Sequence, residues 1–136
     1  MSNDKPVCET YPNGTEAWCL NGEYHRTDGP AIEWIDGTKH WCQYNKLHRT
    51  DGPAIESADG SKRWYLNGNR HRTDGPAIEW PNGDKEWYLN DDLHRTDGPA
   101  IEYANGTKYW WLNNERVRME DVITDPKEQF WWRIKS

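Results

Sequence analysis

Histidine and aspartate recur together, three residues apart, at four places in this chain. Each pair belongs to a copy of the heptapeptide His-Arg-Thr-Asp-Gly-Pro-Ala, and successive copies begin 23 residues apart. The pairs are His25 and Asp28, His48 and Asp51, His71 and Asp74, and His94 and Asp97. An imidazole beside a carboxylate can bind a metal ion or act as an acid–base pair. Metal binding and catalysis are therefore the two chemistries that these pairs suggest.

The regular spacing of the pairs argues against both chemistries. Metal ligands must lie about 2 Å from one ion, whereas equivalent residues of neighbouring hairpins lie roughly 9–10 Å apart. Catalysis seldom needs four copies of one group, and no nucleophile recurs with a base and no glycine-rich phosphate loop is visible. We therefore predict a non-enzymatic protein without metal or cofactor. The aspartates are expected to bond loop amides or the adjacent arginine, and the histidines to close the links between hairpins.

The arginines of the same heptapeptide form a second recurring row. They are Arg26, Arg49, Arg72 and Arg95. Such a row can bind carboxylates or phosphates of a partner, or it can be neutralised by the neighbouring Asp and Glu side chains. The second interpretation is favoured for the row, while Arg49, Arg72 and Arg95 are retained as candidate partner-binding residues.

Turn signals indicate that each repeat is a β-hairpin. Asp-Gly or Asn-Gly stands at 13–14, 36–37, 59–60, 82–83 and 105–106, and these dipeptides favour two-residue type I′ turns. A second turn is expected at 21–22, 45–46, 67–68, 90–91 and 113–114. With Asp36-Gly37 as the loop, residue 34 would face 39 and residue 33 would face 40. The chain is therefore expected to be all-β, an elongated and curled antiparallel sheet of tandem 23-residue hairpins.

This register places most of the aromatic side chains on one face of the sheet. The expected stripe consists of Trp18, Trp34, Trp41, Trp64, Trp80, Trp87 and Trp110, with leucines between them. A sheet must cover one apolar face, so we expect the stripe to be buried by curling, by the C-terminal segment or by dimerisation. The alternatives are a sugar-stacking platform or a groove for a protein.

The opposite face is expected to be wet. There the register pairs Glu56 with Arg63 and places Glu79 opposite Glu86. A second aromatic row, Tyr65, Tyr88 and Trp111, develops on this face toward the C-terminus. Because these positions differ between repeats, the row is a candidate partner-binding surface.

Composition excludes several classes of partner. The formal net charge is −6, with ten Trp and seven Tyr against one Phe, so attraction to nucleic acid or anionic lipid is not expected. No apolar run approaches the ~18 residues of a membrane span, and the first residues have no secretory-signal pattern. A cytoplasmic protein is expected, with Cys8, Cys19 and Cys42 all reduced, because equivalent strand positions lie too far apart for a disulfide.

The repeat unit resembles the MORN repeat family, in the variant form found in bacteria and phages. One unit runs from Asn82-Gly83 through Trp87, Tyr88 and Leu89 to Asn90, followed by the link at 94–100. The resemblance covers residues 6–117, a half repeat plus four repeats. It implies a hairpin-built sheet and a binding or scaffolding role, and the His-Arg-x-Asp-Gly-Pro link resembles proteins of tailed bacteriophages. It would make this chain a viral protein acting in the host cytoplasm.

The two ends of the chain depart from the repeat. Residues 1–5 are expected to be disordered. Residues 118–136 follow Val117, which stands where a fifth histidine would fall, and are expected to form a helical cap with Asp125 as N-cap and Pro126 at the first helical position. The alternative is a free partner-binding tail. Phe130, Trp131 and Ile134 would share one face of that helix, and Trp131 and Trp132 are candidate partner-binding residues.

Three functions remain open from the sequence. The first is binding to a protein, expected to be a host factor that the protein binds or inhibits. The second is carbohydrate binding through the row Tyr65, Tyr88 and Trp111. The third is self-assembly, including a possible homodimer, because the outermost hairpins present edges that can pair.

Overall fold

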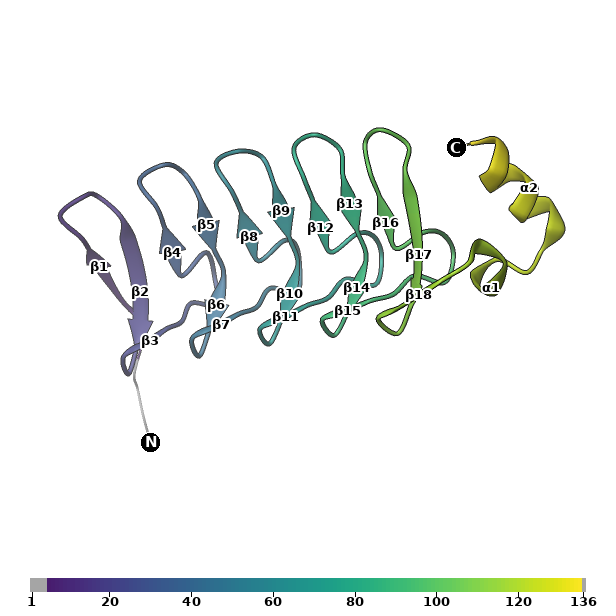
Figure 1. Cartoon of the computed structure of the whole chain (residues 1–136). Helices are drawn as coiled ribbons and strands as arrows, with labels where there is room; N and C mark the ends of the chain where they lie inside the picture. Colours follow the sequence, from purple (N-terminus) through teal and green to yellow (C-terminus); the bar gives the residue numbers. More distant parts are fainter. Residues whose placement is uncertain (1–4, 136) are drawn as a thin grey trace. The chain divides into compact units, whose positions relative to one another are not determined.

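The computed structural model describes residues 5–135 of the chain, so most of the expected disordered segment 1–5 lies outside the described residues. The fold is mostly β, with successive hairpin strands in antiparallel order and two short helices near the C-terminus (Figure 1). The all-β prediction is confirmed. The chain divides into two compact units, residues 1–69 and 70–136, and each is described by itself.

The first unit contains nine strands in hairpins and part of a further pair. The strands are β1 (Val7–Thr10), β2 (Glu16–Leu20), β3 (Glu23–Tyr24), β4 (Ile32–Glu33), β5 (Lys39–His40), β6 (Cys42–Gln43), β7 (Lys46–Leu47), β8 (Ile55–Glu56), β9 (Lys62–Arg63) and β10 (Tyr65–Leu66). The sheet order here is β1-β2-β4-β5-β8-β9, while β3 pairs with β2 and β6 pairs with β7. The boundary between the units falls within β11 (Asn69–Arg70).

The second unit continues the pattern and ends in helices. Its elements are β12 (Ile78–Glu79), β13 (Lys85–Glu86), β14 (Tyr88–Leu89), β15 (Asp92–Leu93), β16 (Ile101–Glu102), β17 (Lys108–Leu112), β18 (Glu115–Val117), α1 (Met119–Val122) and α2 (Pro126–Ile134). The sheet order is β12-β13-β16-β17-β18, and β14 pairs with β15. Among the described residues, neither helix has the length and apolar character required to cross a membrane.

The first turn of each repeat differs from the expected two-residue type. Trp34 N–H donates to Thr38 O (2.8 Å) and Gly37 N–H to Trp34 O (2.9 Å), which makes a three-residue loop with glycine alone in the left-handed region (φ 95°). The Asp36 Oδ1 atom accepts from the Thr38 N–H at 2.9 Å. In the other repeats, the equivalent N–H two residues later donates in the same way to a side-chain oxygen, that of Asn13, Asp59, Asn82 or Asn105. This local bond favours the longer loop.

The longer loop shifts the strand register by one residue, which moves side chains to the other face. Ile32 pairs with His40 and Glu33 with Lys39. The predicted pairings on the wet face are therefore wrong. Glu56 lies opposite Lys62 instead of Arg63, and Glu79 lies opposite Lys85 instead of Glu86.

The second turn has the expected type I′ conformation. Both central residues have positive φ, as at Asn21 (52°) with Gly22 (79°) and at Tyr44 (50°) with Asn45 (66°). The prediction for the second repeat, Asn45-Lys46, is wrong by one residue. Asn is favoured at such positions because its short polar side chain tolerates the left-handed region.

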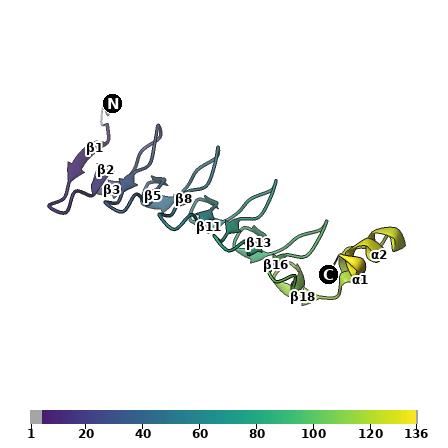
Figure 2. The ribbon, with the colours of Figure 1, turned by 90° about the horizontal axis from the view of Figure 1, so that it is seen from above.

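Small residues, rather than tryptophans, form the tightest part of the packing. The alanines of the links are completely buried, at Ala31, Ala54, Ala77 and Ala100, as is Ala17 of β2, and Ile32, Ile55 and Ile78 next to the link alanines are buried as well. The tryptophan stripe is only half-buried, with Trp34 exposed. Within each unit the sheet is not strongly curled (Figure 2), so the expected burial of the stripe by curling is wrong. Side chains of the links cover part of the stripe instead.

Candidate functional site

Arginines of the links stack on tryptophans of the adjoining strands. The guanidinium carbon lies 3.9 Å from the ring centroid of Trp18 for Arg26, 3.8 Å from that of Trp41 for Arg49, and 3.9 Å from that of Trp87 for Arg95. A cation over an indole face is attracted by the ring quadrupole. Each of these arginines therefore shields one tryptophan from water without any curling of the sheet.

Carboxylates neutralise the same arginine row. Arg49 Nε donates to Asp51 Oδ1 at 2.9 Å, and its Nη1 donates to Glu56 Oε2 at 3.2 Å and to the carbonyl of Pro53 at 3.0 Å. The other repeats have the corresponding arginine–aspartate pairs, Arg26 with Asp28, Arg72 with Asp74 and Arg95 with Asp97. The hydrogen bond from Arg49 lowers the pKa of Asp51, and that from Arg72 lowers the pKa of Asp74. Arg49, Arg72 and Arg95 thus have internal partners.

Histidines of the links hold the second turn of the next repeat. The Nδ1 atom of His25 accepts from the Tyr44 N–H at 3.0 Å, and that of His48 accepts from the Asn67 N–H at 3.0 Å. His71 and His94 do the same for Asn90 and Asn113. Each amide belongs to a residue with positive φ. The histidines therefore have structural contacts, and residues 5–135 contain no cluster of three or more His, Cys, Asp and Glu suited to a metal ion.

The candidate aromatic row is not an open platform. Tyr88 is buried, its hydroxyl donates to Glu86 Oε1 at 3.0 Å, and the guanidinium carbon of Arg70 lies 4.1 Å from its ring centroid. Burial, together with the Glu86 charge, raises the pKa of Tyr88 to about 12. Tyr65 and Trp111 are half-buried. Because the middle residue is enclosed, the row cannot present three ring faces to a ligand.

The C-terminal helix begins where the sequence predicted. Asp125 is the N-cap of α2 and its Oδ1 atom accepts from the Lys127 N–H at 3.0 Å, with Pro126 in the first turn. A carboxylate at this position satisfies a free amide and interacts favourably with the helix dipole. The predicted helix start is confirmed.

The side of α2 that packs against the sheet is not the face predicted from Phe130, Trp131 and Ile134. Trp132 is the buried residue, 7% exposed, and its ring meets that of Trp110 edge-on at 5.4 Å between centroids. Phe130, Trp131 and Ile134 do share a face, but they are 63%, 46% and 64% exposed. As a freely accessible partner-binding residue, Trp132 is therefore excluded, whereas Trp131 is accessible.

The degenerate fifth link explains why Trp132 packs on Trp110. A Cβ atom at the glycine of a regular link would lie only 2.9 Å from the arginine Cζ at Gly52 and 2.6 Å at Gly98. In the fifth link Asp121 stands at this glycine position. Arg118, at the arginine position, instead extends into solvent with a side chain 80% exposed and pairs with Asp121 at 3.5 Å. Trp132 takes the covering role that an arginine has in the regular repeats.

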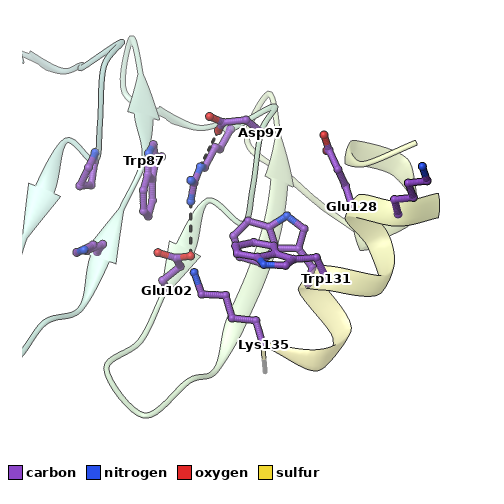
Figure 3. Close-up of a pocket in the computed structure, with 11 residues that line it drawn as sticks. Trp87, Asp97, Glu102, Glu128, Trp131 and Lys135 are labelled. Atoms are coloured by element: carbon purple, nitrogen blue, oxygen red, sulfur yellow. Dashed lines mark hydrogen bonds and ion pairs between the residues drawn. The ribbon is translucent and has the colours of Figure 1, made fainter. Parts of the chain in front are cut away.

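A cleft lies between α2 and the last regular hairpins (Figure 3). Its volume is about 680 Å³, and Pro76, Trp87, Trp131 and Trp132 supply its apolar lining. Trp131 and Trp132 meet edge-on at 4.6 Å between centroids. The Lys135 Nζ atom lies 4.4 Å from the Trp131 ring centroid, so one face of that ring is already next to a cation.

Cationic side chains predominate around the cleft. The cationic residues of its lining are Lys85, Arg95, Lys127 and Lys135, and the anionic residues are Asp97, Glu102 and Glu128. Arg95 pairs with Asp97 at 2.8 Å and with Glu102 at 3.6 Å (Figure 3). Within residues 5–135 the three lysines have no carboxylate within 4.0 Å. Four cationic against three anionic side chains give the lining a net charge of +1, and among the described residues three lysines but one carboxylate, Glu128, stand outside these ion pairs, in a chain whose net charge is −6.

Reasoning from the sequence did not identify the lysines of this cleft. Lys127, Glu128 and Lys135 have no repeat partner, so no periodic pattern marks them, and Lys85 occupies a position that is also lysine in the neighbouring repeats, Lys62 and Lys108. The sequence feature that could have pointed to this region is the fifth link, which has Val117 in place of His and Asp121 in place of Gly. This change shows where the regular packing ends and where a different surface begins.

Comparison with protein-family models and with curated proteins finds no match to this chain. The resemblance to MORN repeats therefore stays an expectation.

Proposed function

We propose that this protein is a non-enzymatic binding module that engages a protein partner through α2 and the adjacent cleft. The observation that carries the proposal is the exposure of Phe130, Trp131 and Ile134 on one face of a nine-residue helix. Large apolar side chains gathered in one exposed patch are typical of interaction sites. Aromatic residues next to a cleft are also the residue types enriched among binding hot spots.

Packing of the helix leaves Phe130 and Ile134 exposed and uses Trp131 only in part, through its contacts with Trp132 and Lys135. Trp132 makes the ring contact with Trp110, and Gln129 Nε2 donates to the Ile123 carbonyl at 2.7 Å. An ion pair between Arg133 and Glu120 at 3.0 Å adds a surface contact. Burying the exposed side chains against a partner would remove apolar area from water at about 25 cal/mol per Å². The free energy gained by burying these exposed side chains is thus available for binding a partner.

The repeats have a supporting role in this proposal. Their arginines stack on tryptophans and pair with aspartates, and their histidines bond to backbone amides of the next turn, so these side chains are used within the fold. The expectation that the partner is a host factor, which comes from the resemblance to phage repeat proteins, belongs with this proposal.

The proposal is tested by affinity capture with variants of the full chain. The double variant Phe130→Glu/Ile134→Glu places charge on the exposed helix face, and Ile35→Glu is the matched control because Ile35 is 71% exposed in the first unit. We expect the unmodified chain and the Ile35→Glu variant to retain the same stoichiometric partner and the double variant to lose it. A partner that the double variant still retains, or no stoichiometric partner for any form, would contradict the proposal.

Self-association through β1 is a second candidate. All four residues of β1 are exposed, and among the described residues of the first unit the strand pairs only with β2, so its other edge is open to a further strand. Because the Tyr11 N–H bonds to Thr15 O in the β1–β2 hairpin, the neighbouring Thr10 N–H points to the open edge, and replacing Thr10 by Pro would block such pairing. Sedimentation velocity should then show an oligomer for the unmodified chain and a monomer for the Thr10→Pro variant, and a monomer for both would exclude this candidate.

A further inference from the structure

We infer that the segment bound in the cleft is an acidic peptide with an apolar side chain at its centre. This inference rests on the proposed function and adds the chemistry of the partner. It is based on the charge balance of the cleft, on its aromatic lining and on the position of the exposed face of α2 beside it.

The charge balance points to an anionic partner. Lys85, Lys127 and Lys135 are exposed and lack a carboxylate within 4.0 Å among the described residues, whereas Arg95 is already bound to Asp97 and Glu102. A partner with carboxylates would thus meet ammonium groups that have no competing ion pair. Complementary charge of this kind determines which partner associates and how fast.

The aromatic lining points to an apolar anchor between the charges. Trp87 and Trp131 line a cleft of about 680 Å³, within the ~300–1,000 Å³ typical of ligand sites. Phe130 and Ile134 are exposed on α2 but do not line the cleft. An apolar side chain of the partner would therefore be buried while its acidic neighbours remain at the lysine-bearing rim.

Carboxylates in the lining favour a peptide over a nucleic acid. Lysines next to tryptophans can also bind a single strand, because bases stack on aromatic rings. However, a continuous phosphate backbone would pass close to Asp97, Glu102 and Glu128, and the chain has a net charge of −6. A peptide can place its few acidic groups at the lysines and avoid these carboxylates.

The experiment measures fluorescence anisotropy of labelled probes with the full chain. The first probe is a peptide in which Leu-Phe is flanked on both sides by Asp and Glu. The second replaces Asp and Glu by Lys, the third replaces Leu-Phe by Ser-Ser, and the fourth is a short oligothymidylate. We expect saturable binding of the first probe alone, weakened several-fold as the salt concentration rises from about 50 to about 300 mM.

Two pairs of variants locate the binding. Lys127→Glu/Lys135→Glu should weaken binding of the acidic probe by about tenfold or more, whereas Lys39→Glu/Lys62→Glu, the same charge change at exposed positions of the first unit, should leave it within about twofold. Trp131→Ala should also weaken binding, because it removes the exposed ring from the lining. Circular dichroism verifies that each variant keeps the fold.

The outcomes distinguish this inference from the proposed function. Failure of the acidic probe to bind, equal binding of the lysine probe, stronger binding of oligothymidylate, or no effect of Lys127→Glu/Lys135→Glu would each overturn the inference. The proposed function would still stand if Phe130→Glu/Ile134→Glu abolished capture of a protein partner. If the acidic probe does not bind and Phe130→Glu/Ile134→Glu does not abolish partner capture, both the inference and the proposed function are overturned.

Discussion

Two tryptophans at equivalent positions, Trp87 and Trp110, are covered in different ways. Trp87 lies under the guanidinium of Arg95, which also binds Asp97 and Glu102. Trp110 meets the indole of Trp132 from α2. The stacking of arginine on tryptophan uses only residues of the repeats, so it can recur in each repeat. The contact with Trp132 uses an apolar residue from outside the repeat and leaves neighbouring apolar residues exposed, which is why the terminal surface is the more suitable place for binding.

The difference accompanies a change in the link. A regular link has glycine where a Cβ atom would collide with the stacked arginine, whereas the fifth link has Asp121 there and forms the helix α1. Without a stacked arginine, Trp110 would be open to water. The repeating contact is thus replaced by an end contact where the regular link is lost.

The largest expected effect is at the end contact. Replacing Trp132 by alanine should lower the free energy of unfolding by about 3 kcal/mol, because a buried indole is lost and a cavity remains. Urea titration followed by circular dichroism measures the change. Arg118→Ala is the control and should alter stability by less than about 0.5 kcal/mol, since the Arg118 side chain is exposed. Equal losses for the two variants would show that Trp132 is not the covering residue.

A second prediction concerns the glycine of a regular link. Gly52→Ala should lower the free energy of unfolding by about 1–2 kcal/mol, because the new methyl group displaces the Arg49 guanidinium from Trp41. Combined with Arg49→Ala, the same substitution should cost nothing or stabilise by about 0.5 kcal/mol, as expected for alanine in place of glycine at a permitted φ. Thermal unfolding of the four proteins of this cycle provides the test. Strictly additive effects would refute the steric explanation.

A smaller effect is expected from the histidine of the same link. His48→Ala removes the acceptor of the Asn67 N–H, and the free energy of unfolding should fall by about 1 kcal/mol. Hydrogen exchange of the Asn67 amide should accelerate in this variant, while the equivalent amide of Asn90, bonded to His71, should be unaffected. Unchanged exchange at Asn67 would mean that the histidine does not hold the turn.

The smallest expected effect is a dependence of stability on acid. The pKa of Asp51 is lowered from 3.8, mainly by its bond from Arg49. A carboxyl group whose pKa is lower in the folded state stabilises the fold above pH 3.8, and this stabilisation is lost as the pH falls through the lower, folded-state pKa. Urea unfolding of the native chain and of Asp51→Asn should therefore differ at pH 7 and converge below that folded pKa. A constant difference at all pH values would contradict this assignment.

Local chemistry accounts for the features that could be predicted from the sequence. Asp125-Pro126 favours a helix start through local contacts, and Asn at the second turn tolerates positive φ by itself. The register of the first turn could not be predicted in the same way, because Asp36-Gly37 is compatible with both a two-residue and a three-residue loop. The bond from Thr38 N–H to Asp36 accompanies the longer loop, and every strand pairing derived from the shorter loop then fails.

The sequence by itself determined the 23-residue period, the hairpin unit and the point near Val117 where regularity ends, because these depend on residues close together in the chain. The tertiary structure alone decided which side chains face one another, that alanines and isoleucines pack most tightly, and that Trp132 rather than Trp131 is buried in α2. The physical reason is that covering a side chain depends on space at a distant position. Arg118 stands in a helical link and extends into solvent, and the indole that covers Trp110 in its place is 22 residues beyond it.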